Sequence, residues 1–133
     1  MSKSNTTEVD VLAANLKGTD PSWRANASRY IALHTGDPGE GGSATTSECA
    51  YGSYARVTVA NADWTGTNPL SNTNLLQFPA CTSGSETITH VSIVTTTSGA
   101  GQIIYSGALT ASRAVSSGIQ PQFAIGALTV AED

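Results

Sequence analysis

The sequence predicts an all-β protein, a single β-sandwich of jelly-roll type with one short N-terminal helix. Three observations predict this fold class. The chain contains seven or eight short β-branched segments separated by turn residues, and these segments do not alternate with helical ones. One pair of segments forms a clear β-hairpin pattern. Finally, 133 residues suffice for one hydrophobic core but not for two ordinary domains.

The hairpin is predicted over Thr87–Leu109, and we expect it at the centre of the sheet. Its two β-branched arms flank Ser98–Gly101, where glycine can adopt the positive φ that a tight reversal requires. Side chains alternate along a strand, so Val91 and Ile93 share one face and Ser92 points to the other.

The N-terminal segment is predicted to be an arm that contains an amphipathic helix. Apolar residues recur at helical spacing between Thr7 and Leu16, and Thr7 with Asp10 resembles a capping box. Gly18 suits the position just after a helix end. We therefore divide the chain into an arm over residues 1–18 and a β-sandwich domain over residues 19–133. The arm could pack on its own sheet or clasp a neighbouring subunit.

The other strands follow in chain order. A strand over Arg29–Thr35 ends at a turn, and Glu40–Glu48 is predicted to be a long exposed loop because it is rich in glycine and serine. The connection around Trp64 is predicted to be irregular. Further strands are predicted over Tyr54–Val59, Asn74–Pro79, Ile119–Ile125 and Gly126–Val130.

Composition argues against several classes of partner. Lys and Arg number 6 against 10 Asp and Glu, which gives a net charge of −4 and no basic run for nucleic acid. No stretch approaches the roughly 20 apolar residues of a membrane span, and no secretion signal is evident. We expect no nucleic-acid or membrane partner. Cys49 and Cys81 lack a metal-binding pattern and are expected to be separate reduced thiols.

No pattern of residues predicts catalysis. His34, Asp37 and His90 could in principle hold a divalent ion, but a histidine in a strand more often satisfies a local hydrogen bond, and Asp37 before a proline is ordinary turn chemistry. The serines occur in no nucleophile-elbow pattern. We therefore predict no enzyme activity, no catalytic residues, no metal and no cofactor.

Several short segments occur in a defined order, namely Leu16–Gly18, Tyr30–Pro38, Ser47–Glu48, Tyr54–Arg56, Phe78–Ala80, Thr89–Ile93, Gly107–Leu109 and Phe123–Leu128. In order and spacing they resemble a family of small virion proteins of tailed bacteriophages, of the head-decoration or tail-fibre type. Cys49, Cys81 and the tail over Ser2–Thr7 depart from the family pattern. The resemblance implies a non-enzymatic structural protein, made in the cytoplasm of the host bacterium and located on the virion surface.

Within the virion we predict a capsid decoration protein that binds the major capsid protein and stabilises the head shell. A compact domain without heptads or repeats favours this over a whole fibre, and a tail or tail-fibre component that contacts the host is the alternative. A surface with few charges favours self-association, for example as a trimer. The residues predicted to contact partners are Val9, Leu12, Leu16, Trp23, Glu40, Glu48, Tyr51 and Trp64.

A carbohydrate-binding module is the alternative from another functional class. Trp23, Trp64, Tyr51 and Tyr54 lie near predicted loops, where aromatic rings could stack on sugars. Packing in the core is the competing explanation for the same four residues.

Overall fold

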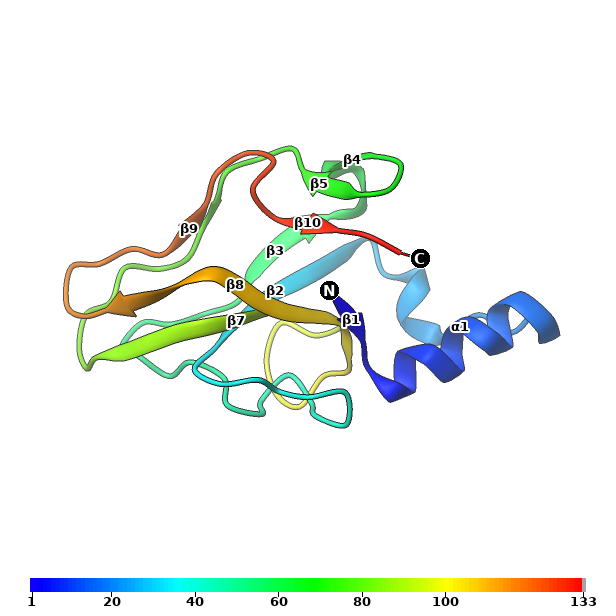
Figure 1. Cartoon of the computed structure of the whole chain (residues 1–133), viewed down its shortest axis with the longest axis horizontal. Helices are drawn as coiled ribbons and strands as arrows, with labels where there is room; N and C mark the ends of the chain where they lie inside the picture. Colours follow the sequence, from blue (N-terminus) through cyan, green and yellow to red (C-terminus); the bar gives the residue numbers. More distant parts are fainter. Residues whose placement is uncertain (133) are drawn as a thin grey trace.

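The computed structural model describes residues 1–132 and shows antiparallel β-sheets with one α-helix projecting from one end (Figure 1). The central sheet has five strands in the order β1 (Ser2–Lys3), β8 (Ile103–Val115), β7 (Glu86–Val94), β2 (Ser28–His34) and β3 (Val57–Ala60). Smaller sheets are formed by β10 (Thr129–Val130), β5 (Leu70–Asn72) and β4 (Trp64–Gly66), and by β6 (Leu76–Gln77) with β9 (Gln122–Phe123). The all-β prediction is confirmed, and the jelly-roll type stays a prediction.

The hairpin of β7 and β8 does lie at the centre, because β7 is hydrogen-bonded to β8 on one side and to β2 on the other. The connection is longer than the four-residue turn that we expected and spans residues 95–102. Gly99 has the left-handed φ of +76°. Gly101 has no room for a side chain, since a Cβ there would collide with Thr96.

Both faces of the central sheet are covered. The main core includes Ile31, Leu33, Val59, Phe78, Ile88, Val91, Ile93 and Ile104. A smaller core on the other face consists of Ala32, Ala44, Val94 and Ile103. The prediction of an exposed loop over Glu40–Glu48 is therefore wrong in part, because Ala44 is completely buried. The loop can lie close to the sheet since its residues there are small.

The connection around Trp64 is also more regular than expected. A 3₁₀ helix over Asn61–Asp63 leads into the antiparallel pair β4 and β5, and β10 adds to the same small sheet. Elsewhere β3 starts later than predicted, at Val57, and β8 extends the hairpin arm to Val115.

The N-terminal residues are built into the domain. β1 pairs with Tyr105 and Ser106 of β8, and helix α1 spans Asn5–Lys17. The helix begins before the predicted capping box at Thr7, because Ser4 serves as the N-cap. Gly18 ends the helix in the left-handed conformation, as the sequence predicts. A second 3₁₀ helix, Ser22–Ala25, returns the chain to the sheet.

Candidate functional site

Polar groups hold α1 on the central sheet. The hydroxyls of Ser4 and Thr7 both donate hydrogen bonds to the carbonyl of Ile103, at 2.5 and 2.9 Å, and both residues are buried. One turn later, Asp10 Oδ2 accepts hydrogen bonds from Gln102 Nε2 at 2.8 Å and from the indole nitrogen of Trp23 at 3.0 Å. The inner face of the helix is thus a row of hydrogen-bonding side chains.

Three of the four large apolar residues of α1 lie on its outer face, whereas Val11 is partly buried and lines the space beside the sheet with Thr7. Val9, Leu12 and Leu16 are 65%, 60% and 81% exposed, and we call them the outer stripe. Residues advance by about 100° around an α-helix, which puts this stripe opposite Thr7. A surface helix of a globular protein normally turns its apolar side to the core. In α1 only Val11 among the large apolar residues lies on the sheet side, and the outer stripe is exposed where another chain can contact it.

An open hollow of about 630 Å³ lies beside α1. Its floor includes the buried side chains of Ile93 and Ile104, and three aromatic side chains line it: Trp23, Trp64 and Tyr105. The polar side chains at the hollow are Thr7, Arg24, Arg29, Asn61, Thr67, Asn68 and Glu132. The structure therefore brings together two predicted site residues, Trp23 and Trp64, that are far apart in the sequence.

The charged side chains around the hollow differ in whether they have a partner of opposite charge. Glu132 accepts hydrogen bonds from Lys3 and from the hydroxyl of Tyr105, which hold the pKa of its carboxyl below the usual range. Arg24 pairs with Asp20 at 2.8 Å. Arg29 has no carboxylate within ion-pair distance among residues 1–132.

Instead, Arg29 Nη1 donates to the carbonyls of Asn26 and Ser28, both at 2.9 Å, and the guanidinium lies 5.1 Å from the centre of the Trp23 ring. Desolvation by the surrounding protein lowers the pKa of Arg29, although such a group stays charged at neutral pH. Among the described residues, the hollow consequently contains a cation that is in ion-pair contact with no acidic side chain.

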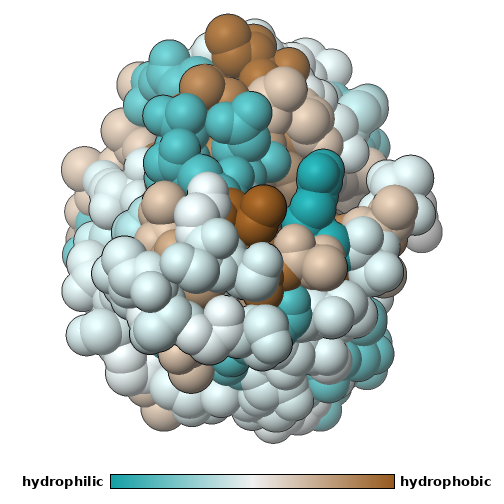
Figure 2. Space-filling model, turned by 90° about the vertical axis from the view of Figure 1, so that its left-hand side faces the viewer, coloured by the Kyte–Doolittle hydropathy of each residue, from teal (hydrophilic) through white to brown (hydrophobic). Residues whose placement is uncertain are grey.

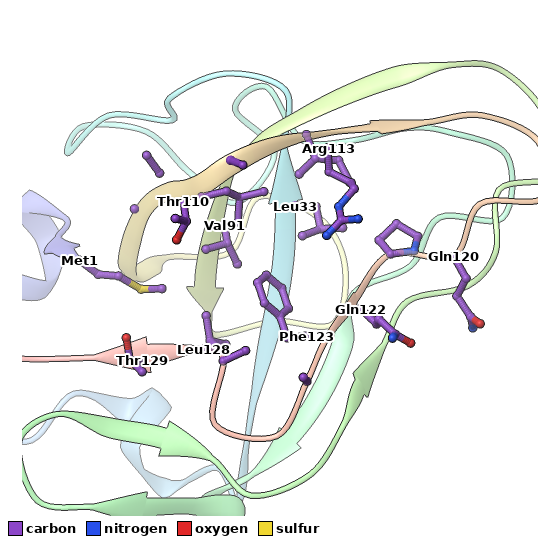
Figure 3. A pocket seen from close by; sticks show the side chains of 18 of the residues that line it. Met1, Leu33, Val91, Thr110, Arg113, Gln120, Gln122, Phe123, Leu128 and Thr129 are labelled. Atoms are coloured by element: carbon purple, nitrogen blue, oxygen red, sulfur yellow. The ribbon is translucent and has the colours of Figure 1, made fainter.

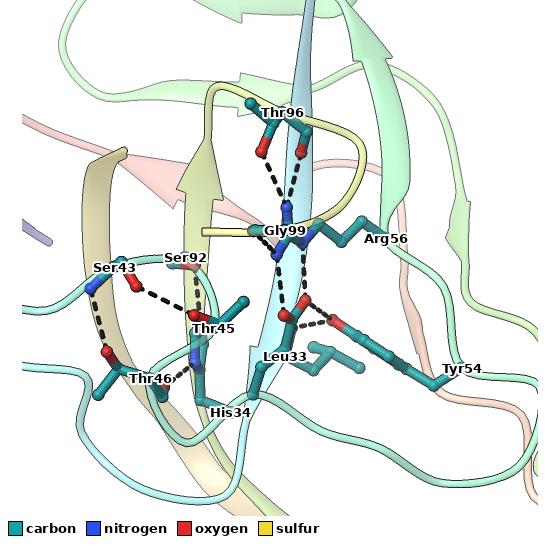
Figure 4. A network of polar contacts seen from close by, with 11 residues as sticks. Leu33, His34, Ser43, Thr45, Thr46, Tyr54, Arg56, Ser92, Thr96 and Gly99 are labelled. Atoms are coloured by element: carbon teal, nitrogen blue, oxygen red, sulfur yellow. Dashed lines mark hydrogen bonds and ion pairs between the residues drawn. The ribbon is translucent and has the colours of Figure 1, made fainter. Parts of the chain in front are cut away.

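A second polar cluster fixes the loop over Glu40–Glu48 to the sheet (Figure 4). Arg56 binds Glu48 in a bidentate geometry, with Nε–Oε1 at 2.7 Å and Nη2–Oε2 at 2.8 Å. Only 2% of the Arg56 side chain and 14% of the Glu48 side chain are exposed. Arg56 also donates to the carbonyls of Thr96 and Gly99 in the hairpin connection. The pair thus joins three segments that are distant in sequence.

Tyr54 and His34 extend this cluster. The hydroxyl of Tyr54 donates to Glu48 and accepts a hydrogen bond from the backbone N–H of Leu33. His34 is completely buried, with Nδ1 at 2.9 Å from the carbonyl of Thr46 and Nε2 at 2.7 Å from the hydroxyl of Ser92. A carbonyl oxygen can only accept, so Nδ1 carries the proton and neutral Nε2 accepts from Ser92.

We expect the protein to lose stability as the pH falls below about 6.5, the ordinary pKa of histidine. Desolvation lowers the pKa of His34, against the opposing effects of the Thr46 hydrogen bond and the Glu48 charge. Below pH 6.5 the unfolded chain therefore binds a proton at His34 more readily than the folded chain does. The free energy of unfolding consequently decreases as the pH is lowered. Urea unfolding at several pH values measures this slope.

Two histidine variants test whether His34 causes this pH dependence of stability. His34→Gln should be less stable than the wild type at neutral pH and should show a weaker pH dependence below about 6.5. His90→Gln keeps His34 and should retain most of the wild-type dependence, because desolvation is the largest cause of the lowered pKa of His34 and the neighbouring His90 adds to it less. Equal slopes for the wild type and His34→Gln would contradict the assignment to His34.

His34 and His90 are paired across β2 and β7, but each residue considered for a metal site is engaged in local hydrogen bonds. Asp37 accepts from the backbone N–H of Gly39, and His90 Nδ1 contacts the hydroxyl of Thr89. No group of three or more potential ligands is found within residues 1–132. Cys49 and Cys81 are both buried free thiols. Desolvation raises the pKa of Cys49 to about 12, so this thiol stays protonated and is a poor nucleophile at neutral pH.

An open groove of about 890 Å³ lies between β8 and the segment 119–129. Phe123, Leu128, Val91 and Leu33 point toward one another in its interior, whereas Gln120 and Gln122 point away (Figure 3). Figure 2 looks at the end of the molecule where β8 ends, and apolar side chains reach the surface there between hydrophilic ones. The groove collects no cluster of titratable or nucleophilic side chains.

The predicted contact residues lie in different surroundings. Val9, Leu12, Leu16 and Glu40 are exposed, and Trp23 and Trp64 are partly exposed at the hollow. Tyr51 is buried, and its hydroxyl donates to the carbonyl of Pro79. Glu48 is engaged in the Arg56 cluster. A partner in contact with the folded chain would thus reach six of these eight residues more readily than Tyr51 and Glu48.

Sequence reasoning did not single out Arg29, Arg56 or Asn72. Asn72 is buried and uses its amide to bind Asn74, Ala124 and Leu128. No helix within residues 1–132 has the length and apolarity to cross a membrane.

Comparison with known proteins places these features in context. A family model described as Podophage GP4 fiber I protein gp80 matches residues 2–131. No curated protein matches the chain.

Proposed function

Because the chain belongs to the Podophage GP4 fiber I protein gp80 family, a family of tailed-phage virion proteins, we propose that it is a non-enzymatic subunit of a fibre on the virion. The family match over residues 2–131 is the observation that carries this proposal. It favours the tail-fibre alternative over the capsid decoration that we predicted from the compact shape of the domain. One compact domain need not form a fibre alone, since neighbouring chains can supply the rest.

The outer stripe of α1 supports an attachment role for this helix. Val9, Leu12 and Leu16 form an apolar row on a helix that projects from the domain (Figure 1). Burying an exposed leucine fully against another protein contributes about 1.5–3 kcal/mol. We propose that the stripe contacts a neighbouring virion protein, which leaves the sheets and the hollow accessible.

We expect antibodies against the chain to label purified virions where fibres attach. Immunogold electron microscopy measures the position, and quantitative mass spectrometry measures the copy number. A phage that lacks the gene provides the control for unspecific label. Label spread over the whole head, with hundreds of copies per particle, would overturn the fibre proposal and support capsid decoration.

The same particles test the outer stripe. Leu12→Ser with Leu16→Ser should fold normally and be depleted from virions by at least about tenfold, since two apolar contacts are lost. Ile125→Ser is the matched control, because Ile125 is 69% exposed but lies far from α1 in the sequence. Equal incorporation of the double variant and this control would exclude the stripe as the attachment surface.

A further inference from the structure

We propose that the hollow lined by Trp23, Trp64 and Tyr105 binds an acidic saccharide, with the carboxylate of the sugar on Arg29. The proposal rests on the proposed function only for the source of the saccharide, which would be a polysaccharide on the bacterial surface. The chemistry of the site is argued from the hollow itself.

The shape and lining of the hollow suit a sugar. Its volume of about 630 Å³ lies in the range of ligand pockets, which extends from about 300 to 1,000 Å³. The floor and the aromatic walls are apolar, which matches the C–H face of a pyranose ring. Asn61, Thr67 and Arg24 lie among the lining residues and could bind hydroxyl groups. A purely hydrophobic ligand would offer these polar groups no further hydrogen bonds.

Arg29 provides the preference for an acid. Its guanidinium lies against Trp23, is partly removed from water and is bound only to backbone carbonyls among the described residues. A planar guanidinium binds a carboxylate through two parallel hydrogen bonds. Glu132, the acidic side chain among the described residues that line the hollow, is already engaged by Lys3 and Tyr105. Asp10, which binds the Trp23 indole, is engaged by Gln102 as well.

The four aromatic residues that the sequence suggested for sugar binding lie in two different places. Trp23 and Trp64 line the hollow, whereas Tyr51 is buried in the main core and Tyr54 binds Glu48. Trp23 already has Arg29 beside its ring, so Trp64 and Tyr105 are the rings left for stacking. The carbohydrate-binding alternative thus acquires a specific site with a charge preference.

Tryptophan fluorescence is a direct probe of this site, because the chain contains two tryptophans and both line the hollow. We would titrate the full chain with D-glucuronic acid, D-galacturonic acid, D-glucose and sodium acetate at equal ionic strength. A saturable change is expected with at least one of the two acids, with the neutral sugar at least about tenfold weaker, because a charge-assisted hydrogen bond is lost.

Single-residue variants distinguish the contribution of the Arg29 charge to binding from that of the Trp64 ring. Arg29→Gln should weaken uronic-acid binding by about tenfold or more and leave glucose binding unchanged. Trp64→Phe keeps an aromatic ring and should retain partial binding, and Trp64→Ala should abolish it. Arg113→Gln is the matched control, an exposed arginine outside the hollow. Circular dichroism checks that each variant is folded, and saturation-transfer NMR repeats the titration without relying on tryptophan emission.

Three outcomes would overturn the proposal. The first is the absence of a saturable signal with both uronic acids in fluorescence and in NMR. The second is an equal response to acetate and to the uronic acids, which would indicate a simple anion site. The third is an unchanged affinity in Arg29→Gln. None of these depends on where the protein lies on the virion, so the fibre proposal and this inference can fail separately.

Discussion

Replacing Arg56 by methionine is expected to lower the free energy of unfolding by about 3–5 kcal/mol, the cost of leaving a buried charge without its partner. Glu48, whose side chain is 14% exposed in the wild type, would remain beside Tyr54 with no cation in contact. The carbonyls of Thr96 and Gly99 would lose their donors at the same time. Urea or thermal unfolding of the purified protein measures the loss.

Two comparisons distinguish this effect from a general effect of losing an arginine. Arg24→Met removes a surface pair with Asp20 and should cost at most about 1 kcal/mol. Adding Glu48→Gln to Arg56→Met should recover part of the stability, because the unpaired charge disappears. If Arg56→Met were as stable as Arg24→Met, the buried pair would not hold the loop on the sheet.

Asn72→Ala should also destabilise the protein strongly, by about 3 kcal/mol or more, since each buried polar group left unpaired costs about 1–3 kcal/mol. The amide of Asn72 donates to the carbonyls of Asn74 and Ala124 and accepts from the backbone N–H of Leu128. These bonds connect β5 to the C-terminal segment. Urea unfolding measures the loss, and limited proteolysis should show faster cleavage in residues 124–130.

Asn74→Ala is the matched control for this variant. Asn74 is exposed, and its backbone carbonyl takes part in the contact with Asn72. Its replacement should change stability by less than about 0.5 kcal/mol. Asn72→Asp tests the donors alone, because a carboxylate can accept from Leu128 but faces two carbonyls. A stable Asn72→Asp variant would show that those two donated bonds contribute little.

The local patterns in the sequence predicted local structure well. Two β-branched arms around glycine predict the hairpin. Its position at the centre of the sheet and the faces of Val91 and Ser92 agree with the structure. The helix end at Gly18 follows equally local chemistry. These features depend on residues close in sequence, so their signals are visible without tertiary information.

Features that depend on distant partners could not be predicted in the same way. In the sequence, the segment of β4 and β5 has the pattern of an irregular connection, because Asn, Gly and Pro dominate there. The strand that completes this sheet, β10, lies near the C-terminus. The burial of Ala44 requires the small core on the second face of the sheet. No spacing pattern in the sequence predicts the contacts made by Arg29, Arg56 and Asn72.

The direction of α1 is the clearest example. The spacing of Val9, Leu12 and Leu16 predicts an amphipathic helix, but it does not say which side faces the sheet. That choice is made by Thr7 and Asp10, whose partners are Ile103 and Gln102. A periodic apolar pattern therefore gave the element and left its orientation open.

The polar anchoring of α1 would have a mechanical consequence under the proposed fibre role. An apolar interface tolerates sliding, whereas the bonds from Ser4 and Thr7 to Ile103 are short and directional, so they fix the angle between helix and sheet. A force on the helix would be transmitted to Ile103, the first residue of β8. Strand β8 is paired with β7 over much of its length. If the chain is a fibre subunit as proposed, a force on the helix would reach β8, the second strand of the sheet, and the backbone hydrogen bonds between β8 and β7 would share it.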